Sequence, residues 1–93
     1  MNPTAAQLFE SQALAQGYQV VLDLRWEPDT VLTEHSHPFD AYALVLQGEL
    51  WLTTAGTTQH ITPGNSYRVQ RGAAHSERYG AHGARTLMAR RTL

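Results

Sequence analysis

The chain has 93 residues, which is enough for one domain and too few for two. Hydrophobic residues make up 42% of it and charged residues 16%, a balance typical of a folded globular protein rather than a disordered chain. The formal net charge is −1, all basic residues are arginines, and cysteine is absent. These features argue against nucleic-acid binding by a basic stripe, and they exclude disulfides, thiolate metal ligands and Schiff-base chemistry on a lysine.

The N-terminal segment, residues 1–17, is rich in alanine, glutamine and leucine. Leu8, Phe9 and Ala13 fall on one helical face, and Gly17 is a favourable stop signal. A short helix or ordered arm is therefore predicted over residues 1–17. The segment lacks the charged start and apolar run of a signal peptide, and no stretch of the chain is apolar enough to span a bilayer. We expect a cytoplasmic protein without a membrane partner.

From Tyr18 onward the hydrophobic pattern changes to a period of two, which is typical of half-buried strands. The first strand is predicted over residues 18–26, and at Gly48 a later strand is expected either to bend or to form a hairpin. The later strands are predicted at residues 31–37, 42–52, 57–61, 66–69, 75–79 and 86–89. Glycine or proline occupies most of the gaps, including a turn expected at residues 80–83. Short strands at this spacing predict an all-β sandwich or barrel over residues 18–93.

Two histidines, His35 and His37, lie two positions apart on a predicted strand. Alternate side chains of a strand project to the same face, so the two rings should lie about 6–7 Å apart and can bind one cation. The same pattern also occurs among ordinary surface or core histidines, and a third histidine, His75, strengthens the metal hypothesis. His60 and His82 lie near predicted turns, and we expect both at the surface.

The spacing around these histidines resembles the first motif of the cupin superfamily. In that motif two histidines are followed by a glutamate and then, after six intervening residues, by a glycine. Here His35 and His37 are followed by Ala41 and, after six residues, by Gly48. The resemblance therefore places an alanine where the family carries a carboxylate ligand.

The second cupin motif, G-x5-P-x-G-x2-H, has its counterpart further along the chain. Gly64, Gly72 and His75 stand in register with it, and Gln70 replaces the proline. The two motifs span His35 to His75, and the strands on either side fit the same barrel, so the resemblance covers most of the chain. The resemblance implies a single cupin barrel, a double-stranded β-helix or jelly roll, preceded by the short N-terminal helix or arm.

The resemblance implies that His35, His37 and His75 hold one divalent metal ion. Neutral imidazoles suit zinc, nickel, iron or copper, manganese also occurs in such sites, and the sequence leaves the metal open. Because Ala41 supplies no carboxylate, the ion keeps its double positive charge and should attract a small anionic ligand. Glu77, two residues beyond His75, shares its face and is a candidate fourth ligand, orienting acceptor or catalytic base. An ordinary pairing of Glu77 with an arginine is the alternative.

Two functions remain open at this stage. One is a metal-dependent oxygenase or isomerase in which Glu77 or a metal-bound water is the base, with Tyr79 as a weaker candidate. The other is a non-enzymatic ligand-binding or sensor cupin, and a barrel whose cavity holds no metal is a further possibility. A small barrel buries little core, so we also expect a homodimer formed through Leu8, Phe9 and the strand at 18–26.

Overall fold

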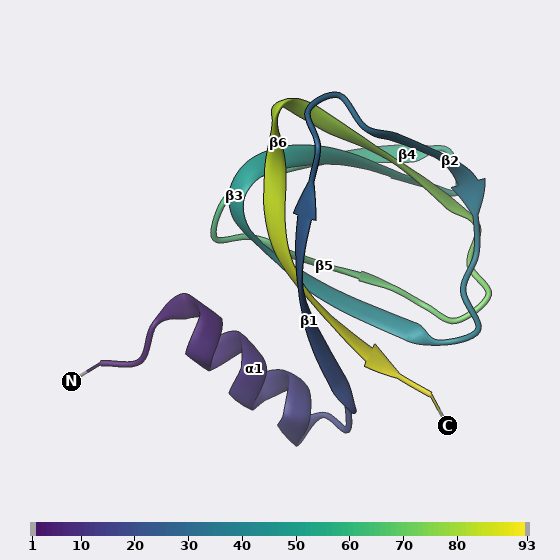
Figure 1. The fold of residues 1–93 in the computed structure, drawn as a ribbon. Coiled ribbons are helices and arrows are strands. Elements are labelled where there is room, and N and C mark those ends of the chain that lie inside the picture. The colour runs from purple at the N-terminus through teal and green to yellow at the C-terminus, as the bar shows by residue number, and fades with distance from the viewer. Residues whose placement is uncertain (1, 93) are drawn as a thin grey trace.

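A computed structural model describes residues 2–92 of the chain, and Figure 1 shows its fold. The described residues form one helix and six strands, as the all-β prediction requires. The elements are α1 (Ala5–Ala15), β1 (Val20–Trp26), β2 (Val31–His35), β3 (Asp40–Thr54), β4 (Thr57–Ile61), β5 (Ser66–Val69) and β6 (His75–Arg91). No helix in the described part of the chain has the length and apolar character needed to cross a membrane.

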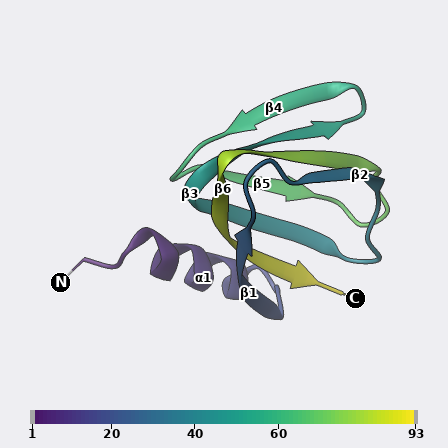
Figure 2. The same cartoon turned by 45° about the horizontal axis from the view of Figure 1, so that its top comes forward.

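Two long antiparallel strands, β3 and β6, organise the barrel because both run through the two halves of a single six-stranded sheet. In one half, the first part of β3 and the second part of β6 pair with each other and with β5 and β1 at the edges. In the other half, the second part of β3 and the first part of β6 pair with each other and with β4 and β2 at the edges. The strands close around a common centre while α1 lies outside, as the views in Figures 1 and 2 agree. This is the jelly-roll arrangement expected.

The two halves of the sheet meet at a corner built around glycine. Gly48 and Gly83 both have positive φ, and a Cβ on Gly48 would lie 2.0 Å from the carbonyl oxygen of Gly83. Only glycine permits this backbone approach. The turn predicted at residues 80–83 is therefore wrong: β6 continues through it with a bulge opposite β3. Glycine marks bulges and close approaches as well as turns, and the sequence pattern does not separate these cases.

The core has an inner and an outer part. The inner cluster fills the barrel and includes Val45, Leu50 and Tyr79, each fully buried. The outer cluster lies between α1 and the barrel, where the ring of Phe9 packs on that of Tyr42 with centroids 4.7 Å apart. Because β3 is buried on both faces here, its sequence is a continuous apolar run instead of an alternating one.

The helix begins at a capping box formed by Thr4 and Gln7. Its buried residues are Phe9 and Ala13, whereas Leu8 is 48% exposed. This corrects the expected dimer surface, because Phe9 is already used inside its own chain. Its aromatic ring faces Tyr42 and is not available to a partner.

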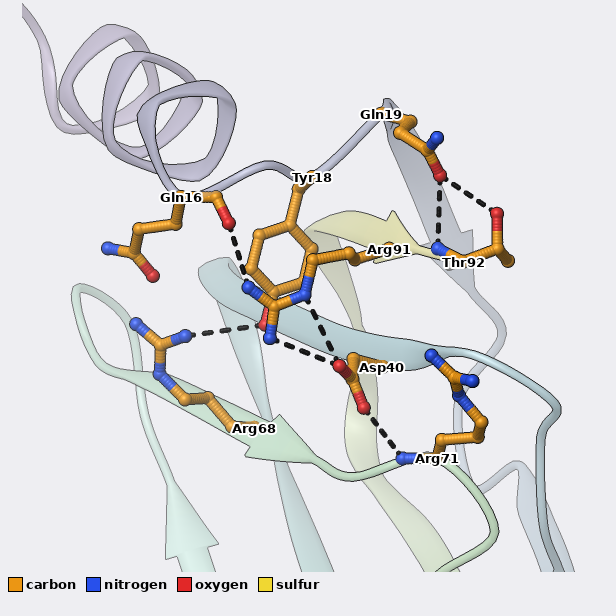
Figure 3. A network of polar contacts seen from close by, with 8 residues as sticks. All are labelled: Gln16, Tyr18, Gln19, Asp40, Arg68, Arg71, Arg91 and Thr92. Carbon is orange, nitrogen blue, oxygen red and sulfur yellow. Dashed lines mark hydrogen bonds and ion pairs between the residues drawn. The ribbon is translucent and has the colours of Figure 1, made fainter.

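A polar network fastens the end of α1 to the barrel (Figure 3). The guanidinium of Arg91 donates to the backbone oxygen of Gln16 at 2.7 Å and pairs with the Asp40 carboxylate at 3.1 Å. Asp40 also accepts the Arg71 backbone N–H at 2.9 Å, and Arg68 donates to the Tyr18 hydroxyl at 3.3 Å. The backbone N–H of Arg71, followed by Arg91, lowers the pKa of Asp40, so this carboxylate is ionised near neutral pH.

Candidate metal centre

Three histidines gather inside the barrel, although they come from separate segments. His35 ends β2 and His75 begins β6, where the two are partners in the strand register. Their ring centroids lie 4.3 Å apart, and the His37 ring lies 4.9 Å from each of them. One potential ligand nitrogen on each ring lies within 4.8 Å of the others. Such a cluster fits around a single cation.

His37 does not lie on a strand as predicted, because β2 ends at His35. The pairing of β2 with β6 is already irregular between Leu32 and His35, and Pro38 follows directly. The carbonyl of His37 instead accepts the Gly72 N–H at 2.8 Å, which ties the first histidine motif to the second. Leaving the strand brings the His35 and His37 rings closer than the 6–7 Å expected along an extended chain.

Backbone contacts define the protonation pattern of two of the rings. Nδ1 of His35 lies 2.7 Å from the carbonyl oxygen of Thr33, and Nδ1 of His75 lies 3.0 Å from that of Ala73. A carbonyl can only accept, so each Nδ1 carries the proton in the neutral ring. The lone pair is therefore on Nε2, which is the arrangement typical of histidines that bind metals.

His37 packs face to face on Phe39, with centroids 4.7 Å apart and an interplanar angle of 13°. Burial, followed by the nearby His75, His35 and Arg90, lowers the pKa of His37 below its usual value. The ring is therefore neutral at pH 7, as a metal ligand must be.

Glu77 lies in the same cavity, on the face predicted from its spacing to His75. Its side chain is 9% exposed, and its Oε2 lies 4.0 Å from Nε2 of His35. The Tyr67 and Tyr79 hydroxyls each donate to Oε1 at 3.4 Å. Burial raises the pKa of both phenols, so they stay protonated donors. Tyr67 was not predicted as a site residue, because its only signal in the sequence is its alternation with the buried Val69 on β5.

The histidines and Glu77 form the polar part of a cavity of about 390 Å³. Its walls are mostly apolar and include Leu24, Trp26 and Met88. Trp26 is held in place by stacking on Tyr79, with ring centroids 4.5 Å apart. Ala41 lines this cavity, as the first motif implied. A volume of this size suits a small organic molecule.

A further charged residue that the sequence analysis did not single out is Arg90. It lines the cavity from β6, and its guanidinium carbon lies 4.7 Å from the centre of the Phe39 ring. Its only sequence signal was a charge at an inward position of a strand that otherwise alternates between apolar and polar.

His60 and His82 are exposed as expected, and His60 pairs with Glu49 at 2.6 Å.

The Cupin domain family model matches residues 23–87, which is more than half of the chain. The chain belongs to the cupin family. This confirms the family assignment drawn from the two motifs. No curated protein sequence matches the chain significantly.

Solved structures resemble this cupin in fold. A conserved protein of unknown function from Streptococcus pyogenes is 19% identical with a TM-score of 0.69, covering 78% of this chain and 63% of its own. KdgF from Halomonas sp. is 15% identical with a TM-score of 0.69, covering 83% and 72%. A variant of Bacillus subtilis oxalate decarboxylase is 16% identical with a TM-score of 0.73, covering 88% of this chain but 23% of its own. At these identities the likeness shows the fold alone.

Proposed function

We propose that this cupin binds one divalent metal ion through His35, His37 and His75, and that a small anionic molecule completes the coordination. The observation that carries the proposal is the convergence of three imidazoles at one cavity, two with Nδ1 bonded to a backbone carbonyl. Backbone acceptors of this kind fix ring orientation before an ion arrives.

The donor set fits a metal. Three imidazoles without a coordinating carboxylate suit zinc, nickel, copper or iron, with positions left open for a ligand. Manganese belongs in the test as well, because the B. subtilis oxalate decarboxylase has Mn(II) centres. A bound ion would supply a Lewis acid and lower the pKa of a coordinated water. The chain's own contribution is to orient the rings and to limit access through the apolar walls.

Glu77 is the residue on which catalysis would depend. As a base in an oxygenase or isomerase reaction it would accept a proton beside His35. A specific observation favours binding without catalysis as the second candidate function: the same carboxylate accepts hydrogen bonds from Tyr67 and Tyr79. A carboxylate oxygen that already holds two donors is less available to accept a proton from a substrate.

The test is metal content. Protein purified without a histidine tag or chelating column is incubated separately with Zn(II), Ni(II), Cu(II), Fe(II) and Mn(II), desalted, and analysed by mass spectrometry of the elements. We expect about one equivalent per chain for at least one of these ions. Retention of none of the five would refute the proposal.

A further inference from the structure

Arg90 is a half-buried cation that has no carboxylate partner among residues 2–92. Its Nε is buried and has no hydrogen-bond partner. Within residues 2–92 its guanidinium pairs with no carboxylate, whereas Arg85 pairs with Asp23 at 2.7 Å and Arg91 with Asp40 at 3.1 Å. A buried donor without a partner is costly, so such a group in a cavity points to a ligand that satisfies it.

The register of the sheet places this cation opposite the missing carboxylate. Arg90 on β6 is the direct partner of Ala41 on β3, and side chains at partner positions share one face. Both residues line the cavity that contains the three histidines. The methyl group of Ala41 leaves space there and supplies no acceptor.

The charges of the cavity require an anion. The three histidines bring no negative charge to the cavity, and the carboxylate of Glu77 already accepts two phenolic hydrogen bonds. A divalent ion together with the Arg90 guanidinium therefore leaves the cavity positively charged even with Glu77 ionised. The apolar walls, which include Leu24, Trp26 and Met88, favour a ligand with a short apolar body.

We propose that Arg90 binds the carboxylate of a small organic acid in this cavity, where that carboxylate takes the place a glutamate at position 41 would occupy. The inference rests on the proposed metal-binding function and names the chemical class of the small molecule that would complete the coordination. A guanidinium presents a planar set of donors that matches a carboxylate, and such charge-assisted bonds are strong. The ligand would thus face the metal with the same group that Arg90 holds.

The test compares two molecules of the same shape and different charge, propionate and propionamide. Co(II)-loaded protein is titrated with each while the Co(II) absorption and the Trp26-dependent fluorescence are recorded. We expect the propionate affinity to fall about tenfold or more in Arg90→Gln. Arg78→Gln is the matched control, because Arg78 also stacks on an aromatic ring, Trp51 at 4.1 Å, but does not line the cavity. Its propionate affinity should stay within about twofold of the parent.

Ala41→Glu provides a second variant if Arg90→Gln fails to fold by circular dichroism. The new carboxylate would occupy the place proposed for the ligand, so propionate binding should be lost while Co(II) is retained. Propionate binding equal to the parent's in every variant that folds would overturn the inference, and so would equal affinity of the parent for propionamide.

The proposed function fails independently, in the retention test of the five ions, which is made before any propionate is added. If the parent retains neither Co(II) nor any of the five ions, the same titrations are followed in metal-free protein by nuclear magnetic resonance. Arg90-dependent propionate binding would then support this inference while the metal proposal falls. Binding that does not depend on Arg90, or no binding, would overturn it.

Discussion

His35 and His75 are direct partners across β2 and β6, with ring centroids 4.3 Å apart. Forty positions separate them in the chain, so their meeting depends on the strand register and not on local sequence. A shift of this register by one residue would turn one ring to the opposite face. The candidate metal centre is therefore a property of the folded barrel, and its integrity should report on the barrel itself.

The first prediction concerns the ligands. His35→Ala, His37→Ala and His75→Ala should each strongly reduce metal content, because two imidazoles hold a divalent ion far more weakly than three. His60→Ala and His82→Ala are the controls, since both histidines are exposed and lie outside the cluster. Elemental analysis of untagged protein measures the effect. A His60→Ala protein that lost metal as completely as His75→Ala would show that the ligand assignment is wrong.

Much of the barrel was predictable because its signals are local. The strand at 66–69 matches β5, and the strand at 57–61 matches β4, because glycine or proline turns bound both in the sequence. The meeting of the three histidines was predicted because their spacing along the chain resembles that of the two cupin motifs. The strand patterns alone could not reveal the continuity of β6 through Gly83, since a bulge and a turn use the same residue.

The parts of the site that the sequence did not reveal depend on long-range pairing. Arg90 became a candidate only when the register placed it opposite Ala41. Tyr67 emerged because β5 pairs with β3 and brings its hydroxyl to Glu77. Neither contact has a local signature, because both residues are also ordinary in exposed strands.

The second prediction concerns pH and the network of Figure 3. The folded-state pKa of Asp40 is lowered by the Arg71 backbone N–H and by Arg91, below an unfolded value of about 3.9. The stabilisation is therefore complete above pH ~4 and is lost as the pH falls through the folded-state pKa. Asp40→Asn should lower the melting temperature at pH 7. The difference in melting temperature between this variant and the parent should become smaller toward pH ~3.

Circular dichroism melts at both pH values make this comparison. Glu10→Gln on the exposed face of α1 is the control and should melt like the parent at pH 7. A difference between Asp40→Asn and the parent that stayed constant over the whole range would show that the ionised carboxylate contributes nothing.

The third prediction tests the packing of α1 on the barrel. Phe9 is 3% exposed and contacts Tyr42, so Phe9→Ala should lower the free energy of unfolding by about 3–5 kcal/mol. Leu8→Ala, at a position 48% exposed, should change it by less than about 1 kcal/mol. Urea denaturation measures both values. Equal effects would mean that the helix does not dock through Phe9.

The fourth prediction is a homodimer, now without Phe9 in its interface. Leu8, Leu14 and Val20 remain exposed on α1 and the start of β1, and an apolar surface of this kind favours association. Light scattering at micromolar concentration should give twice the chain mass of 10.3 kDa. Val20→Glu should shift the mass toward the monomer. A parent that stayed monomeric at this concentration would refute the prediction.

The last prediction distinguishes two places for negative charge near the metal. Oε2 of Glu77 lies 4.0 Å from Nε2 of His35, so Glu77→Gln should weaken metal binding by removing charge while nearly preserving shape. Ala41→Glu should instead tighten the binding of iron(II) or manganese, because it adds an anionic oxygen to a site of neutral nitrogens. Glu49→Gln is the control, since Glu49 pairs with the exposed His60 outside the cavity.

Metal dissociation constants should change by more than about threefold, roughly 0.65 kcal/mol, in the first two variants and not in the control. If only Glu77→Gln acts, Glu77 is the carboxylate of the site and position 41 lies beyond reach of the ion. If only Ala41→Glu changes the dissociation constants, Glu77 accepts hydrogen bonds from the two tyrosines and does not influence the metal. Constants unchanged in both would mean that no carboxylate influences the ion, and both placements would have to be abandoned.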